Sequence, residues 1–117
     1  MSTLDLGASG ESRATRLLVR EGYRIVERNF RCKSGELDIV ARDGRVLCFV
    51  EVRSRANADY GHAAEMVDAR KQARVSRVAQ HYLALRSPRF EEARFDVVAI
   101  TGDEEVLIKD AWRPRPD

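Results

Sequence analysis

The chain has 117 residues, of which 44% are hydrophobic and 34% charged, and this composition excludes an intrinsically disordered protein. Its length allows one modest core, so we predict a single domain over residues 1–112. The net charge of +2 is too small to identify a nucleic-acid-binding protein by itself. Cys32 and Cys48 form neither a metal motif nor a disulfide framework, and we see no signal peptide and no stretch of transmembrane length, so we expect a cytoplasmic protein.

The first half of the chain predicts one helix followed by three strands. Residues 9–21 carry an apolar stripe at helical spacing, and a glycine at their end acts as a stop signal. The strands are expected at residues 23–30, 36–41 and 46–53, where β-branched and apolar residues dominate. An Asp-Gly turn at 43–44 indicates that the second and third of these strands form a hairpin.

The alternation of side chains predicts which residues of the two hairpin strands share a face. One face of the second strand is expected to carry Leu37, Ile39 and Ala41. Asp38 should therefore lie on the opposite face from Leu37. The third strand is apolar on both faces for most of its length, which is typical of a central strand covered on both sides. Near its end, Glu51 and Arg53 are two residues apart and project from one face.

The second half of the chain predicts a loop at residues 55–65, a long helix at 68–85, a strand at 94–100 and a short edge strand at 106–109. The first three strands of the chain should form an antiparallel meander. The long helix should then cross over and place the fourth strand parallel to the third. Residues 113–117 are expected to form a disordered tail.

Two acidic residues lie where buried strands should stay apolar. Asp38 and Glu51 are costly to bury unless they are paired or used. If the hairpin brings the two carboxylates together, they could hold a hard divalent cation. The simpler interpretation is a strand-end ion pair with Arg53 or Arg31 as partner, and spacing alone favours it.

Other charged residues also have simple interpretations. Arg70, Arg74 and Arg77 form a row on the long helix that could follow a phosphate backbone, although such a row is usually only a solvated face. Asp96 is expected to pair with Arg94 or with a helix. These residues alone therefore do not define a function.

Several motifs, taken in order, resemble a known family. The matching pieces are Gly10-Glu11, Arg28-Asn29-Phe30-Arg31, Gly35-Glu36-Leu37-Asp38, Phe49-Val50-Glu51-Val52-Arg53-Ser54-Arg55, Lys71 and Arg94-Phe95-Asp96. Together they resemble the YraN-like family of small bacterial proteins, within the PD-(D/E)xK nuclease superfamily that also contains archaeal Holliday junction resolvases. The resemblance implies an α/β fold with a restriction endonuclease-like α-β-β-β-α-β core, in which helices flank a mixed central sheet.

The resemblance also implies a site for Mg²⁺ or Mn²⁺. Asp38 and Glu51 would be its acidic ligands, and the backbone carbonyl of Val52 could also face the metal. Glu11 would reach in from the first helix, directly or through water, and stabilisation of the helix dipole is the alternative role for this residue. Mg²⁺ prefers a few carboxylates together with waters, which this set would supply.

The chain departs from the superfamily at Arg53, where a lysine is usual. Arginine can offset negative charge on a phosphate but cannot act as a base. Lys71 is expected to compensate, because some superfamily members supply the lysine from the following helix. The alternative is that Lys71 is a surface lysine whose stem covers the core. The implied catalytic set is Asp38, Glu51, Arg53, Lys71 and Glu11.

The function implied by the resemblance is that of a nucleic-acid-binding, nuclease-like protein, a Mg²⁺-dependent endodeoxyribonuclease acting on branched or structured DNA. The candidate nucleic-acid contacts are Arg31, Arg55, Arg70 and Arg74. A homodimer is expected by analogy with junction-cleaving relatives, and no membrane partner is expected. Two alternatives stay open: a catalytically inactive DNA-binding module with the same fold, and a scaffold that binds a protein partner.

Overall fold

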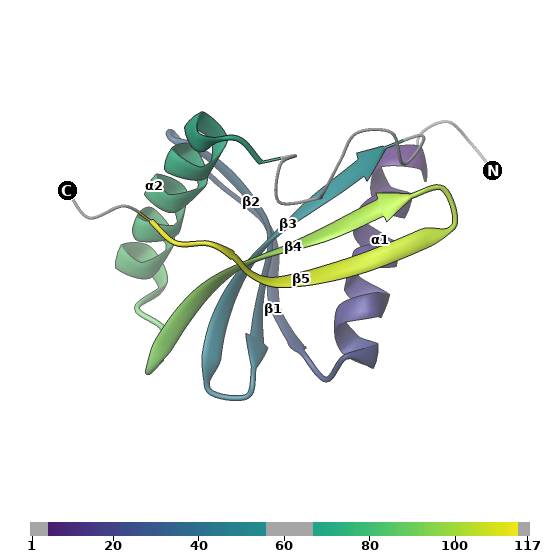
Figure 1. The fold of residues 1–117 in the computed structure, drawn as a ribbon. Helices are drawn as coiled ribbons and strands as arrows, with labels where there is room; N and C mark the ends of the chain where they lie inside the picture. The colour runs from purple at the N-terminus through teal and green to yellow at the C-terminus, as the bar shows by residue number, and fades with distance from the viewer. Residues whose placement is uncertain (1–4, 56–66, 115–117) are drawn as a thin grey trace.

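The computed structural model describes residues 5–55 and 67–114, with side chains for residues 10–54 and 67–114. The elements in chain order are α1 (Asp5–Arg20), β1 (Arg24–Cys32), β2 (Gly35–Asp43), β3 (Val46–Arg55), α2 (Ala69–Arg86), β4 (Glu92–Thr101) and β5 (Glu104–Trp112). They form an α/β fold, as the sequence predicts (Figure 1). Most of the predicted loop at 55–65 and the last three residues of the predicted tail lie outside the described residues.

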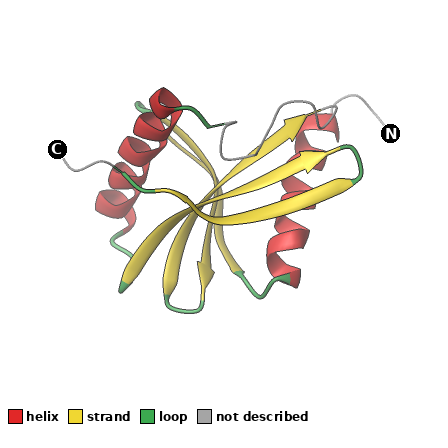
Figure 2. Cartoon of the chain, viewed as in Figure 1, coloured by secondary structure: helices red, strands yellow, loops and turns green. Residues whose placement is uncertain are grey.

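The five strands form one mixed sheet in the order β1-β2-β3-β4-β5. β1 with β2, β2 with β3, and β4 with β5 pair antiparallel, whereas β3 and β4 pair parallel. The connection between the parallel strands contains α2, so the predicted meander and the predicted crossover are both confirmed. The two helices lie on either side of the twisted sheet (Figure 2).

β3 is the central strand, and hydrophobic clusters cover both of its faces. Leu47 and Phe49 belong to a cluster that includes the buried side chains of α2. Cys48 and Val50 point the other way, into a cluster with the apolar stripe of α1. The predicted central strand is therefore confirmed, and each helix attaches to the sheet through its own core.

The regular alternation predicted for the second strand is wrong. Leu37 packs into the α2 cluster, whereas Ile39 and Ala41 pack into the α1 cluster. Opposite this point, Asn29 of β1 has a left-handed backbone with φ of 57°, between residues that pair with Ile39 and Leu37. The pairing register of β1 with β2 is continuous across Asn29, so the change of face in β2 coincides with this left-handed residue and not with a register shift. Asp38 lies where β2 changes face.

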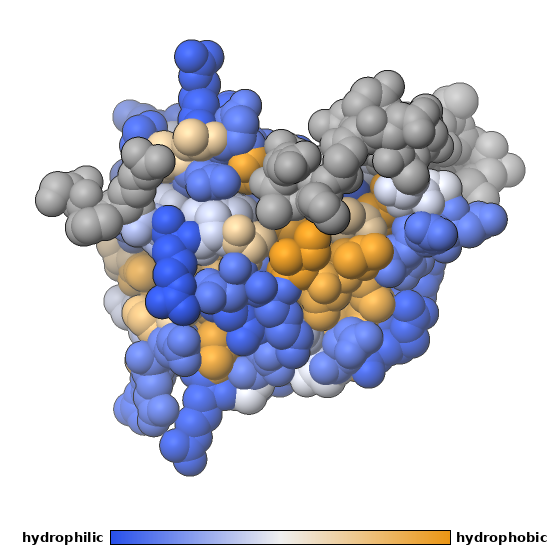
Figure 3. Space-filling model, in the orientation of Figure 1, coloured by the Kyte–Doolittle hydropathy of each residue, from blue (hydrophilic) through white to orange (hydrophobic). Residues whose placement is uncertain are grey.

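The edge strand β5 is longer than the predicted span of 106–109. It continues to Trp112, whose ring stacks on Phe95 of β4 with centroids 4.8 Å apart. Asp110 has φ of 54° and marks a bulge, which explains why the sequence pattern ends early. A hydrophobic area lies on the surface over β4 and β5 (Figure 3).

Asp96 of β4 is fully buried and is the centre of a polar network. The hydroxyl of Tyr23 donates to its Oδ2 at 2.6 Å, and the Nε of Arg94 donates to its Oδ1 at 2.8 Å. The backbone N–H of Asp110 also donates to Oδ1, at 2.9 Å. The predicted pair with Arg94 is confirmed, and these donors satisfy a charge that would otherwise be very costly to bury.

Replacing Tyr23 by phenylalanine removes the shortest hydrogen bond to Asp96. We expect Tyr23→Phe to lower the free energy of unfolding by about 2 kcal/mol, because a buried carboxylate loses a donor. Urea unfolding monitored by circular dichroism measures this change. Tyr82→Phe is the matched control, since this buried tyrosine makes no side-chain hydrogen bond within residues 10–54 and 67–114, and it should cost less than about 0.5 kcal/mol. Equal losses in the two variants would contradict this account of the network.

Candidate functional site

The two predicted acids meet at one place, which we call the acidic corner and define by Asp38, Glu51, Arg53 and Lys71. Glu51, near the end of β3, is only 2% exposed. Asp38 reaches across from β2, and its Oδ2 accepts the backbone N–H of Val52 at 2.9 Å. In return, the backbone N–H of Asp38 lies 3.5 Å from Oε2 of Glu51, which is a weak hydrogen bond. The hairpin thus brings the two carboxylates together.

Lys71 comes to this corner from the first turn of α2. Its Nζ lies 3.8 Å from Oε1 of Glu51. The helix start is held in place by Asp68, whose side chain caps the backbone N–H of Lys71 at 2.8 Å, and by Gln72, which donates to the carbonyl of Val67. Lys71 therefore reaches the corner from a capped helix end, and its role as a compensating lysine stays a prediction.

Arg53 also contacts the acidic corner, with its Nη2 3.8 Å from the same oxygen of Glu51. This contact is one of the strand-end ion pairs that the sequence suggested. The Nε of Arg53 is buried and has no hydrogen-bond partner among the described side chains and backbone. An unpaired buried N–H is unfavourable, so the site retains a donor that a phosphate or carboxylate oxygen could satisfy.

The electrostatics of the corner favour protonation of its acids. Burial, and then the neighbouring Asp38, raise the pKa of Glu51 to about 7, although Lys71 and Arg53 oppose this shift. Burial also raises the pKa of Asp38, and the hydrogen bond from Val52 partly opposes it. The nearby charge of Glu11 raises the pKa of Asp38 further. Negative charge at this corner is therefore incompletely compensated by the protein itself.

Glu11 lies close to the acidic corner but has partners of its own. Its Oε2 accepts from Nδ2 of Asn29 at 3.1 Å and faces Nη2 of Arg28 at 3.4 Å. Within residues 10–54 and 67–114, no three His, Cys, Asp or Glu side chains converge closely enough to hold a metal by themselves. A role for Glu11 as a third ligand stays a prediction.

The carboxylate oxygens at the corner are suitable ligands for Mg²⁺ or a similar divalent ion. Mg²⁺ commonly uses one or two carboxylates and keeps several waters. The oxygens of Glu51 have only long contacts, of 3.5 to 3.8 Å, and are therefore available. The backbone N–H of Val52 is engaged by Asp38, and the predicted role of the Val52 carbonyl stays a prediction.

The predicted nucleic-acid contacts come from β1, from the end of β3 and from α2. Arg31 pairs with Glu36 at 3.0 Å and so does not serve as the partner of Asp38 or Glu51. Arg70 and Arg74 are exposed on α2, and the side chain of Arg55 lies outside the described residues. The roles of these four arginines therefore stay predictions.

Gly10 contributes to the site in a way that the sequence analysis missed. A Cβ atom at this position would lie 3.2 Å from Oγ of Ser54 in β3. The absence of a side chain lets α1 approach the end of β3 closely, and this approach places the neighbouring Glu11 beside the corner. A glycine inside a helical pattern is the signal that could have indicated it.

The fold and the site define a small α/β protein with one buried carboxylate, one half-buried carboxylate and a helix lysine near the end of a strand of a mixed sheet. Among the described helices, none is long and apolar enough to cross a membrane. A family model described as "Uncharacterised protein family UPF0102" matches residues 10–100. The chain belongs to this family, which confirms the predicted YraN-like membership.

Relatives in this family match the chain over most of its length. A UPF0102 protein of Moorella thermoacetica is 46% identical over 102 residues, covering 87% of this chain and 85% of the relative. One of Dechloromonas aromatica is 46% identical over 111 residues, covering 95% and 91%. One of Beutenbergia cavernae is 50% identical over 95 residues, covering 81% and 80%. The names of these relatives state no activity, so the function of the chain has to be inferred from its site.

The raised pKa of Glu51 predicts that stability falls with rising pH. Its pKa in the folded protein, about 7, exceeds the ordinary value of 4.5, so the native state binds this proton more tightly than the unfolded state does. Stability should therefore decrease between about pH 4.5 and pH 7. Glu51→Gln removes the ionisation, and at pH 8 it should be more stable than the wild type by up to about 3 kcal/mol.

Urea unfolding of both proteins at pH 4.5 and pH 8 measures this effect, and the difference should vanish at the lower pH. Glu36→Gln is the matched control, because the side chain of Glu36 is 51% exposed and its ion pair with Arg31 contributes little. A Glu51→Gln variant that is less stable than the wild type at pH 8 would contradict the account.

Proposed function

We propose that this protein is a metal-dependent endonuclease that hydrolyses phosphodiester bonds in branched or structured DNA at the acidic corner. The observation that carries the proposal is that Lys71, from the helix after the third strand, lies 3.8 Å from Glu51, whose carboxylate also contacts the backbone N–H of Asp38. The order α-β-β-β-α-β of the first six elements supports a restriction endonuclease-like core, in which acids of this kind bind Mg²⁺ or Mn²⁺. A homodimer would present two such corners to the two strands of a branched substrate.

Each residue of the acidic corner has a distinct part in this proposal. Asp38 and Glu51 would hold the metal, and the hydrogen bond from the Val52 N–H fixes the orientation of the Asp38 carboxylate. The chemistry supplied by a bound divalent ion is polarisation of the scissile phosphate and a lower pKa for the attacking water. Lys71 would orient the attacking water and offset negative charge on the phosphate. Arg53 donates its unpaired Nε–H to a phosphate oxygen.

A specific observation also favours a second candidate, a catalytically inactive DNA-binding module. Arg53 occupies the usual lysine position, and its guanidinium lies against Glu51. If this cation and Lys71 together compensate Glu51, the corner needs no metal. Such a module would bind DNA with a strong salt dependence, in the presence or absence of a chelator.

Metal binding separates these two candidates through thermal stability. We expect MnCl₂ at pH 8 to raise the Tm of the wild type by several degrees, because a ligand at 100 times its Kd stabilises the native state by about 2.7 kcal/mol. Asp38→Asn should abolish the gain, since one of the two carboxylate ligands is lost. Differential scanning calorimetry gives the measurement, with Glu36→Gln as the control that keeps the gain. A wild type that shows no gain at any manganese concentration supports the inactive module instead.

Cleavage of DNA tests the enzyme directly. Purified protein with Mg²⁺ or Mn²⁺ should cut a four-way junction, and Lys71→Ala should lower the rate about 100-fold or more, because one charged group that stabilises the transition state is removed. Arg70→Ala, which removes the exposed neighbouring cation, should change the rate less than about tenfold. A gel assay with labelled junction, duplex and single-stranded DNA measures these rates. Cleavage that survives Asp38→Ala would reveal a contaminating nuclease and contradict the assignment.

A further inference from the structure

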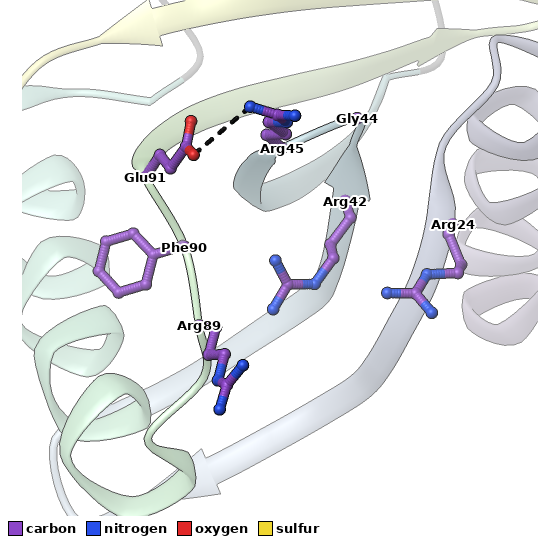
Figure 4. A pocket seen from close by; sticks show the side chains of 7 residues that line it. All are labelled: Arg24, Arg42, Gly44, Arg45, Arg89, Phe90 and Glu91. Carbon is purple, nitrogen blue, oxygen red and sulfur yellow. Dashed lines mark ion pairs between the residues drawn. The ribbon is translucent and has the colours of Figure 1, made fainter.

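A second charged site lies at the opposite end of α2 from the acidic corner. An open pocket of about 500 Å³ lies between the start of β1, the β2–β3 turn and the connection from α2 to β4. We call it the arginine pocket and define it by Arg24, Arg42, Arg45, Arg89 and Glu91 (Figure 4). Lys71 is in the first turn of α2 and the pocket begins beyond the last turn, so the two sites are about 25 Å apart along the helix.

The arginine pocket has an excess of positive charge. Arg45 pairs with Glu91 at 3.6 Å. Within residues 10–54 and 67–114, no carboxylate lies within 4.0 Å of the guanidinium nitrogens of Arg24, Arg42 or Arg89. Three guanidinium groups therefore share the pocket without a carboxylate to balance them.

The position of two of these arginines makes the excess costly. Arg24 and Arg42 are direct partners across the antiparallel pair of β1 and β2, and like charges at such positions destabilise a sheet. Arg42 is also half-buried, which weakens its contact with water. Figure 4 shows the guanidinium groups of Arg24, Arg42 and Arg89 turned toward a common space. The C-terminus of α2 lies nearby, but its helix dipole is equivalent to only about half a negative elementary charge, which does not balance three guanidinium groups.

From this geometry we propose that the arginine pocket binds phosphate groups, either of a free nucleotide or of a nucleic-acid strand. Guanidinium groups match phosphate oxygens with paired hydrogen bonds. A polyphosphate, or successive phosphates of a strand, brings several negative charges into a small volume, whereas a single carboxylate neutralises one guanidinium. If the ligand is a nucleic-acid strand, the proposal rests on the proposed function, because the pocket would then be a second DNA contact. If the ligand is a free nucleotide, the proposal is independent of that function.

Two binding measurements distinguish the sources of phosphate. ATP is titrated by calorimetry without divalent cations, and a fluorescein-labelled single strand of twenty nucleotides is titrated by anisotropy in EDTA. Replacing Arg24, Arg42 and Arg89 by glutamine should weaken binding of the recognised probe at least tenfold. If the DNA strand is the ligand, the slope of log K against log salt concentration should also become shallower, by the loss of roughly two to three phosphate contacts. Arg16→Gln, an exposed arginine of α1, is the control that should keep wild-type binding.

Thermal unfolding provides a second readout that does not depend on a binding probe. Arg24→Gln relieves the repulsion with Arg42, so without ligand its Tm should be equal to or higher than that of the wild type. Sodium pyrophosphate should raise the Tm of the wild type more than that of this variant. These measurements need no divalent metal and can be made in an Asp38→Asn background. An absence of DNA cleavage at the acidic corner can therefore be distinguished from an absence of phosphate binding in the arginine pocket.

Three results would overturn the proposal. The first is a wild type that binds neither ATP nor the DNA strand. The second is a triple variant that binds both probes as tightly as the wild type. The third is polyglutamate that binds the pocket more tightly than either phosphate probe, which would identify an acidic protein segment as the occupant.

Discussion

The burial of Glu51 beside Asp38 is the constraint on which the rest of the site depends. A carboxylate that is 2% exposed and next to a second carboxylate is unfavourable in its charged form, and its pKa rises to about 7 as a result. Lys71 and Arg53 reduce this cost from 3.8 Å, too far for short hydrogen bonds. We propose that a divalent cation completes the compensation.

The remainder of the fold serves to hold these groups together. β3 extends from the centre of two hydrophobic cores, so Glu51 has little freedom to move toward solvent. The left-handed Asn29 coincides with the change of face in β2, and Asp38 at this point can reach the backbone of β3. The Asp68 cap fixes the first turn of α2 and hence Lys71. The corner is therefore built on a central strand, its hairpin neighbour and a capped helix start.

Local sequence patterns indicated much of this arrangement, including the central β3, the crossover helix and the meeting of Asp38 with Glu51. They failed at Asp38: the alternation rule assumes a regular pleat, but β2 changes face between Leu37 and Ile39, opposite the positive φ of Asn29. Pairings between distant residues were also hidden, such as Glu11 with Asn29 and Arg24 opposite Arg42. The net charge of +2 gave no sign that cations gather in the arginine pocket, because charge totals carry no positions.

The most direct test of the central claim is a crystal structure of the protein soaked in MnCl₂, with anomalous diffraction used to locate manganese. The account predicts an anomalous peak between Asp38 and Glu51, with an oxygen of each carboxylate within about 2.3 Å of the metal. Lys71 should then lie beside the ion and no longer serve as the main counter-charge of Glu51. An absence of manganese at this position, with Arg53 and Lys71 still against Glu51, would contradict the account and leave the corner as a structural ion pair.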